Sequence, residues 1–331
     1  MSEELTRRVF LALGSATLVA VTSCTLNLEG AGSKGAQATL KDDSGNVLAV
    51  AFSPDGKTLV SASNFGDGDG GMRFWDVAGR RVGSFLPENH VPIYSLAFSP
   101  DGAYIAASAG TVLLVDAASG EEVALFDRVQ SAENDTSVAF GSEGNLIASA
   151  GWDNDIRLWD VRTRTQKRLL QGHSARVYAV LFTHDGNSLM SISQDGTLRT
   201  WDLGTGKCSV LAADLNPLAM SLSPDGRSVA VAGGIQGGSG SLQIFDLPPG
   251  RSTAGGTVPV RMDPISAIAY HPDGKSLAVG DDISVQLWDL KRAVRTRSWS
   301  TTDVVRSVSF SPGGQTLAAG INDGTIILCE V

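Results

Sequence analysis

Short runs of alternating apolar and polar residues recur along almost the whole chain. One run reads VYAVLF at residues 177–182, and another reads VRSVSF at residues 305–310. A period of two places the apolar residues on one face of an extended chain, so each run predicts a β-strand with two unlike faces. A tight-turn sequence follows each run, which predicts a chain built from antiparallel hairpins.

The turn sequence is a pentapeptide that occurs seven times. It reads FSPDG at 52–56 and 98–102, FGSEG at 140–144, FTHDG at 182–186, LSPDG at 222–226, YHPDG at 270–274 and FSPGG at 310–314. Most copies reverse the chain at an Asp-Gly pair, because glycine adopts the positive φ angle that other residues resist. The copies begin 40 to 48 residues apart. Such a period is typical of closed arrays of small β-sheets.

Each repeat contains three further strands. The most distinctive is the third strand, which ends in RFWD at 73–76, RLWD at 157–160, RTWD at 199–202 and QLWD at 286–289. With the turns and the period, these motifs resemble the repeats of the WD40 family over residues 36–331. The resemblance implies an all-β fold, a seven-bladed β-propeller of four-stranded antiparallel blades. Val115, Phe245 and Cys329 replace the tryptophan in the other repeats, and we expect those blades to form because each residue is apolar and precedes an acid.

The two ends of the repeat region predict how the ring closes. The seventh repeat stops at Val331, directly after its third strand, and so lacks an outer strand. A spare β-prone stretch, AQATL at 36–40, precedes the first repeat. We expect this N-terminal strand to complete the last blade, because an open sheet edge leaves backbone groups unpaired.

Residues 1–23 differ from the repeats and predict an export signal. Arg7 and Arg8 precede an apolar run of 15 residues over 9–23, which is short for a membrane-spanning helix. The pattern resembles a twin-arginine signal peptide that ends in a lipobox, VTSC at 21–24. The resemblance implies cleavage before Cys24 and a lipid on its thiol, and the glycines in residues 24–35 indicate a flexible tether. An uncleaved membrane anchor and a chance pair of arginines remain alternatives.

The charge of the chain bears on its partners. The formal net charge is −9, and the four charges in residues 1–23 cancel one another, so the processed protein keeps it. An acidic protein repels a phosphate backbone, which argues against a nucleic-acid partner. We expect a monomeric ring.

The chain has three cysteines. Cys24 is assigned to the lipid, whereas Cys208 and Cys329 fall in repeats far apart around the ring. A disulfide needs Cα atoms about 6 Å apart. We therefore expect no disulfide.

One repeat holds residues that invite a catalytic interpretation. The set is His173, Asp195, Trp201 and a serine at Ser191 or Ser193. A serine, a histidine and an aspartate are the members of a hydrolytic triad, but no nucleophile-elbow sequence surrounds either serine. The resemblance implies instead a structural tetrad, a hydrogen-bonded chain that joins three strands of one blade. We expect the structural role and no catalytic site.

The sequence gives little indication of a metal or cofactor. The four histidines lack the spacing of metal ligands. Asp67 and Asp69, in the loop 64–71, resemble the start of a calcium loop, but the distant bidentate glutamate is missing. The matching loop at 233–240 is rich in glycine but lacks the lysine of a phosphate-binding loop. We expect no metal and no cofactor, and we expect both loops on the same face.

The resemblance also implies which residues surround the central channel. In WD40 propellers, positions before the first strand and before the turn aspartate ring the top of the channel, and here they are Asn134, Trp152, Arg176, Gln194 and Asn322. Tryptophan and arginine are frequent anchors of protein interfaces. We interpret these residues as a protein-binding surface, with packing of Trp152 on a neighbouring loop as the alternative.

These expectations lead to one predicted function and two alternatives. The predicted function is a non-catalytic scaffold that binds a protein or peptide through its loop-rich top face. The signal predicts a lipid-anchored position on the outer face of the cytoplasmic membrane, or elsewhere in a bacterial cell envelope. The alternatives are an exported propeller enzyme with a cofactor or metal, and a structural subunit of an envelope complex.

Overall fold

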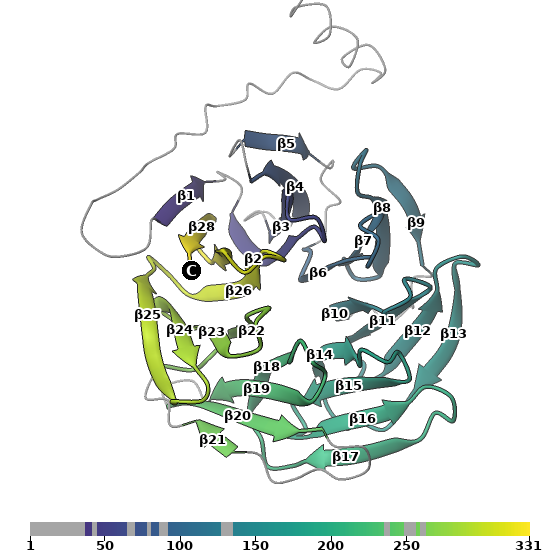
Figure 1. The fold of residues 1–331 in the computed structure, drawn as a ribbon. Helices are drawn as coiled ribbons and strands as arrows, with labels where there is room; N and C mark the ends of the chain where they lie inside the picture. The colour runs from purple at the N-terminus through teal and green to yellow at the C-terminus, as the bar shows by residue number, and fades with distance from the viewer. Residues whose placement is uncertain are drawn as a thin grey trace, which may run out of the picture.

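The computed structural model describes residues 37–41, 45–64, 70–77, 81–85, 92–126, 135–234, 239–247, 256–258 and 263–331. Within these ranges the chain forms seven antiparallel sheets of four strands each. Figure 1 shows the sheets arranged as blades around a central axis. The predicted all-β, seven-bladed propeller is confirmed. We number the blades 1 to 7 in the order of their inner strands.

The strands occupy corresponding positions in every blade. The inner strands are β2 (Asn46–Phe52), β6 (Ser95–Phe98), β10 (Asp135–Phe140), β14 (Val177–Phe182), β18 (Pro217–Leu222), β22 (Ala267–Tyr270) and β26 (Val305–Phe310). The second strands are β3 (Thr58–Asn64), β7 (Tyr104–Ser108), β11 (Leu146–Gly151), β15 (Ser188–Ser193), β19 (Ser228–Gly234), β23 (Ser276–Gly280) and β27 (Thr316–Ile321). The third strands are β4 (Gly70–Asp76), β8 (Val112–Asp116), β12 (Ile156–Asp160), β16 (Leu198–Asp202), β20 (Gly240–Asp246), β24 (Ser284–Asp289) and β28 (Thr325–Glu330). The outer strands are β5 (Arg81–Phe85), β9 (Glu122–Leu125), β13 (Thr165–Leu170), β17 (Cys208–Ala212), β21 (Gly256–Val258), β25 (Val294–Ser300) and β1 (Gln37–Lys41).

The ring closes in blade 7, where strands from both ends of the chain meet. Strand β1 pairs antiparallel with β28, with Gln37 opposite Cys329, and the strand order of the sheet is β1-β28-β27-β26. Ala38 and Leu40 are buried in a cluster that includes Ile326. The expectation that an N-terminal strand completes the last blade is therefore confirmed. The closed ring covers the edge that β28 would otherwise expose.

The hydrophobic core lies between neighbouring blades. Val60 of β3 and Leu113 of β8, for example, belong to one buried cluster. The small residues of the second strands allow the blades to approach closely. At the seam, a Cβ atom on Gly320 would lie 2.6 Å from a methyl carbon of Val47, so a larger residue there would push blades 7 and 1 apart.

The tryptophans of the third strands are core residues. Trp75, Trp159 and Trp201 are among the largest fully buried side chains. The residues that replace tryptophan elsewhere, which are Val115, Phe245 and Cys329, are buried too. An apolar residue of any shape therefore fills this position, as the sequence suggested.

The pentapeptide turns form a second set of contacts between blades. We call the face on which they lie the bottom face. In the first turn, Gly56 has a φ of 71° and its N–H donates to the carbonyl of Ser53 at 2.8 Å. A Cβ on Gly56 would lie 3.1 Å from Pro312, in the turn of blade 7. This glycine thus permits both the tight reversal and the close approach of the neighbouring turn.

Serines on four inner strands link successive blades. In each case the serine Oγ accepts a hydrogen bond from a backbone N–H of the next inner strand: Val138 to Ser95 at 3.2 Å, Val180 to Ser137 at 3.2 Å, Tyr270 to Ser221 at 3.0 Å and Val50 to Ser307 at 3.1 Å. The last of these bonds crosses the seam. These bonds satisfy backbone N–H groups of the inner strands that have no hydrogen-bond partner within their own blade.

Antiparallel connections alternate between the two ends of a blade. The loops between second and third strands, and those from an outer strand to the next inner strand, therefore lie opposite the pentapeptide turns, on what we call the top face. Two predicted features of that face lie outside the described residues, namely Asp67 with Asp69 and the middle of the loop 233–240 at residues 235–238. So do Arg7, Arg8 and Cys24, with the predicted signal and tether. The described ranges contain no helix with the length and apolarity to cross a membrane.

Candidate functional site

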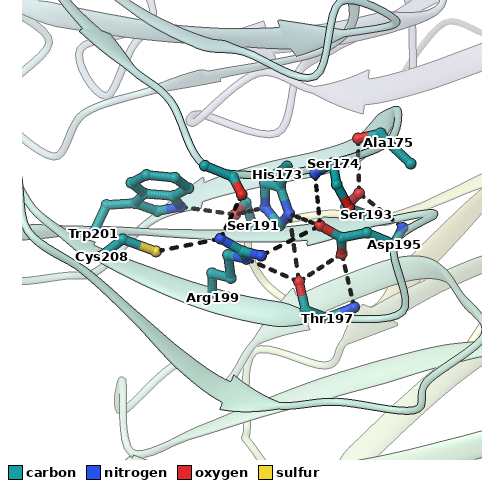
Figure 2. Close-up of polar contacts among 11 residues, drawn as sticks. His173, Ser174, Ala175, Ser191, Ser193, Asp195, Thr197, Arg199, Trp201 and Cys208 are labelled. Carbon is teal, nitrogen blue, oxygen red and sulfur yellow. Dashed lines mark hydrogen bonds and ion pairs between the residues drawn. The ribbon is translucent and has the colours of Figure 1, made fainter.

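A chain of hydrogen bonds runs through the interior of blade 4 (Figure 2). Trp201 Nε1 on β16 donates to Ser191 Oγ on β15 at 2.8 Å. The same Oγ lies 2.7 Å from His173 Nε2, and His173 Nδ1 lies 2.7 Å from Asp195 Oδ2. His173 precedes β14 and Asp195 follows β15. The chain therefore joins a top-face loop to the second and third strands.

Asp195 is the most strongly bonded member of this chain. Its carboxylate also accepts a hydrogen bond from Thr197 Oγ1 at 2.6 Å and one from the backbone N–H of Ser174 at 3.1 Å. Burial acts to raise the pKa of Asp195, but the bonds from Thr197 and His173 prevail and lower it to about 2. Burial lowers the pKa of His173, so its ring is neutral at pH 7.

The geometry of blade 4 argues against hydrolysis. The side chains of Ser191 and His173 are fully buried, so a substrate cannot reach the serine oxygen. Ser193 is buried as well and is not part of the chain, because its Oγ donates to the carbonyl of Ala175 at 2.9 Å and accepts from the N–H of Asp195. Of the two serines named from the sequence, Ser191 is the one bonded to His173.

Blade 3 has a shorter version of the same arrangement. Trp159 Nε1 donates to Ser149 Oγ at 2.9 Å, as the corresponding pair does in blade 4. Asp153, which has no histidine bonded to it, forms an ion pair with Arg157 at 2.6 Å. Arg157 is largely buried, and a buried cation requires such a partner.

Blade 6 contains a different buried network, which sequence reasoning missed. Trp288 Nε1 donates to Gln286 Oε1 at 3.2 Å, and Gln286 Nε2 donates to Asp281 Oδ2 at 3.2 Å. Gln286 lies opposite Val279, whereas in blade 4 the corresponding position opposite Arg199 is Ser191. The sequence did contain a signal for this network. Gln286 stands two residues before the tryptophan, and the apolar Val279 replaces the serine.

On the top face, the structure brings three of the predicted binding residues together. The guanidinium carbon of Arg176 lies 4.0 Å from the centre of the Trp152 ring and 5.2 Å from that of Tyr178. The N–H of Gln194 donates to the carbonyl of Arg176 at 2.8 Å. Trp152 remains 46% exposed, so it is available for contact. We call Trp152, Arg176 and Tyr178 the arginine–aromatic cluster.

The other two predicted residues do not join this cluster. Asn134 lies outside the described residues. Asn322 belongs to blade 7, where its Oδ1 accepts a hydrogen bond from Arg306 Nε at 2.9 Å and its Nδ2 donates to Asp303 at 3.2 Å. It therefore forms part of a separate polar group on the rim.

The inner strands enclose the channel. A cavity of about 270 Å³ is lined by residues from several inner strands. Many of them stand four positions before the pentapeptide, namely Leu48, Tyr94, Tyr178, Leu218, Ser266 and Arg306. Sequence reasoning named none of these residues, although their constant place in the repeat could have revealed them. The wall is mixed in character, with two tyrosines, one arginine and four serines among apolar residues.

Charge is unevenly distributed around the channel mouth. Burial lowers the pKa of Arg176, and the nearby Tyr178 and Tyr94 oppose that shift. The ordinary value for arginine is so high that the guanidinium stays charged. On the side of blades 6 and 7, burial and the neighbouring Asp263 raise the pKa of Asp282, which indicates crowding of carboxylates.

The described residues contain no cluster that could hold a metal ion, and their two cysteines are not joined to each other. Within those ranges, no three His, Cys, Asp or Glu side chains lie close enough together to hold a metal ion. Cys208 is exposed and Cys329 is buried, and both are free thiols. Burial raises the pKa of Cys329 to about 12, so it is not a thiolate at neutral pH.

Comparison with known proteins identifies relatives of parts of the chain. It is 32% identical over 117 residues to guanine nucleotide-binding protein subunit beta-like protein 1 of Mus musculus, which covers 34% of this chain and 36% of the relative. It is 22% identical over 353 residues to Protein HIR1 of Gibberella zeae, covering 86% of this chain and 33% of the relative. It is 26% identical over 195 residues to pre-mRNA-processing factor 19 homolog 2 of Arabidopsis thaliana, covering 57% of this chain and 36% of the relative. The chain spans about a third of the length of these relatives.

A solved structure and a family model match much more of the chain. The structure of U3-55K superposes with a TM-score of 0.78 at 17% identity, covering 89% of this chain and 98% of the other, a likeness that concerns the fold alone. The family model described as WD domain, G-beta repeat matches residues 35–76, 79–116, 132–160, 164–202, 258–289 and 292–329. The six matches leave out most of blade 5, which the structure nevertheless shows as a four-stranded sheet. The matched segments make up well over half of the residues of this chain, and the chain therefore belongs to the WD40-repeat family.

Proposed function

We propose that this protein is a non-catalytic scaffold that binds a protein or peptide through its top face. The observation that carries the proposal is the arginine–aromatic cluster, in which an exposed Trp152 lies against Arg176 at the channel mouth. Tryptophan and arginine contribute more binding energy to interfaces than most residues. The closed ring holds them in place, so little conformational freedom is lost when a partner binds.

The second part of the proposal concerns location. The arginine pair at residues 7 and 8, the short apolar run and Cys24 support export and a lipid anchor on the outer face of the cytoplasmic membrane. Residues 24–35 then act as a tether that leaves the ring free to turn toward its partner. Fractionation of cells that express the Cys24→Ala variant tests this part. We expect the variant to leave the membrane fraction, and complete retention there contradicts the lipid anchor.

The binding function is tested by crosslinking in cells. A photoreactive amino acid at Trp152 is compared with one at Lys57, an exposed residue beside the first pentapeptide turn on the bottom face. Illumination followed by mass spectrometry of the products identifies what lies against each position. We expect a defined protein product from position 152 and none at comparable yield from position 57. Equal yields from the two positions, or none from position 152, contradict binding at the top face.

A further inference from the structure

The guanidinium of Arg176 has no hydrogen-bond or ion-pair partner within the described part of the chain. Its Nε is buried and has no hydrogen-bond acceptor, and no described carboxylate forms an ion pair with it. Two other arginines of the same sector are paired, Arg157 with Asp153 at 2.6 Å and Arg199 with Asp195 at 3.5 Å. Desolvation of a cation without a compensating anion is unfavourable, as the lowered pKa of Arg176 indicates.

The aromatic rings hold this cation in a fixed position. Trp152 and Tyr178 both lie within 6 Å of the guanidinium carbon, which is the range of a cation–π interaction. Such contacts fix the plane of the guanidinium but occupy none of its N–H donors. An arginine held this way is ready to make two parallel hydrogen bonds to a planar carboxylate, with little further loss of side-chain freedom.

Arg306, at the repeat position that Tyr178 occupies in blade 4, provides a comparison from the other side of the channel. It lies on the inner strand of blade 7, and its Nε donates to Asn322 at 2.9 Å. It also lies close enough to Asp282 to oppose the rise in the pKa of that carboxyl, in a region that includes Asp263, Asp281 and Asp303. Arg306 is therefore compensated from within the protein, whereas Arg176 is not.

We propose that Arg176 binds the side-chain carboxylate of an aspartate or glutamate in a peptide segment of the partner. The inference rests on the proposed function and names the chemistry that the top face recognises. Trp152, exposed beside Arg176, covers the apolar part of the same segment. A peptide fits better than a nucleic acid, because the net charge of −9 and the carboxylates near Arg306 repel a phosphate backbone.

The test uses the full chain and an array of immobilised 12-residue peptides. All other positions are random, and the central residue is fixed as Glu, Gln or Lys. We expect the wild-type protein to bind Glu-centred peptides about tenfold more tightly than Gln-centred ones, as a charge-assisted pair implies. Arg176→Gln should abolish that preference, and Arg176→Lys should retain part of it because the charge remains.

Arg306→Gln is the matched control, and it should keep the wild-type preference for Glu. Thermal melts show whether each variant folds. If Arg176→Gln does not fold, Trp152→Ala replaces it, because this change removes an exposed ring and should lower the preference for Glu at least about threefold. Equal binding of Glu-centred and Gln-centred peptides overturns the inference, and so does a preference that survives in Arg176→Gln.

The outcomes separate this inference from the proposed function. If peptides bind without preference for an acid while position 152 still crosslinks to a protein, the function stands and the acidic partner is wrong. If no peptide binds and position 152 yields no product, both are wrong. Binding of single-stranded DNA in preference to every peptide also overturns the inference.

Discussion

Blades 4 and 6 hold a buried tryptophan and a nearly buried aspartate in corresponding places, but they connect the two with different residues. In blade 4 the connection passes through Ser191 and His173 and so reaches the loop before the inner strand. In blade 6 it passes through Gln286 and stays within one hairpin. In both blades the buried tryptophan N–H and the aspartate are therefore hydrogen-bonded, although different side chains connect them.

Blade 4 also differs on the top face from the opposite side of the ring, which blades 6 and 7 form. Blade 4 presents Arg176 against aromatic rings, with no acid from the described residues. Across the channel, Arg306 is bonded to Asn322 and lies near several carboxylates of blades 6 and 7. One side of the mouth thus has an arginine without a carboxylate near it, while the arginine on the other side lies among carboxylates. The comparison can be tested at four points, from the largest expected effect to the smallest.

The largest loss of stability is expected at the seam in blade 7, where the two ends of the chain pair. Deletion of residues 37–41 removes the buried Ala38 and Leu40 and exposes the edge of β28. We expect the free energy of unfolding to fall by at least about 3 kcal/mol, the cost of losing a large buried side chain together with its strand. A thermal melt measures the loss. Thr39→Ala, which keeps the strand, serves as the control, and a deletion variant that melts like wild type contradicts closure at this seam.

The two buried networks should differ in their contribution to stability. His173→Ala removes one hydrogen-bond partner from each of Ser191 and Asp195, which keep their bonds to Trp201 and Thr197, and it removes a ring that contacts Trp201 at a centroid distance of 5.8 Å. We expect a loss of about 2–3 kcal/mol from the two lost bonds and the cavity. Gln286→Ala should cost only about 1 kcal/mol, since Asp281 keeps its bonds to the backbone N–H groups of residues 283 and 284.

Urea denaturation of both variants under identical conditions measures the difference. We expect the larger loss in His173→Ala because the blade 4 network links three segments of the blade, whereas the blade 6 network stays within one hairpin. Equal losses in the two variants contradict that interpretation.

Only the blade 4 network has a histidine, so it should make stability depend on pH. Burial lowers the pKa of His173 from its ordinary 6.5, so the unfolded chain binds a proton there before the folded protein does. Stability is then complete above about pH 6.5 and falls as the pH drops below that value. Asp195, with a pKa of about 2 in the fold, adds a further loss between about pH 4 and pH 2.

The free energy of unfolding measured at pH 7.5, 6.5 and 5.5 tests the histidine. His173→Gln should flatten the dependence over this interval, whereas Gln286→Ala should leave it as in wild type. An unchanged slope in His173→Gln assigns the effect to another group.

The smallest effect on stability should come from the channel mouth. Trp152→Ala removes a half-exposed ring whose contact with Arg176 is worth about 0.5–1 kcal/mol. Arg306→Ala should change stability by a similar small amount, because its bond to Asn322 lies in an exposed position. Thermal melts of the two variants should therefore agree closely, and their difference should appear only in partner binding. A large loss of stability in Trp152→Ala assigns that ring to packing instead.

Sequence reasoning recovered the fold because the repeat carries its information locally. The period, the Asp-Gly turns and the alternating strands each predict structure within about ten residues, and seven copies agree with one another. The pairing of β1 with β28 could be predicted too, because the seventh repeat lacked one strand and the N-terminus offered one. The tetrad residues were found by their place in the repeat, although the choice between Ser191 and Ser193 required the structure.

The candidate site was harder to predict, since it is formed by several repeats. Trp152 and Arg176 belong to different blades, and their contact depends on the angle at which the blades meet. Tyr94 and Tyr178 line the channel because of their shared place in the repeat, but one repeat alone does not show which of its strands is innermost. The Gln286 network was missed for a related reason. The expected partner of the tryptophan was a serine on the second strand, but Val279 occupies that place and Gln286 of the third strand accepts the hydrogen bond instead.

The sequence by itself determined the local elements, their number and their order, because turn chemistry and strand periodicity act between residues that are close along the chain. Only the tertiary structure decided which polar groups are bonded and which charge is left without a partner. Those outcomes depend on distances of a few ångströms between segments that are 20 or more residues apart, such as Arg176 over Trp152 and His173 against Asp195. Burial then sets their energy, since the same charges in water would interact only weakly.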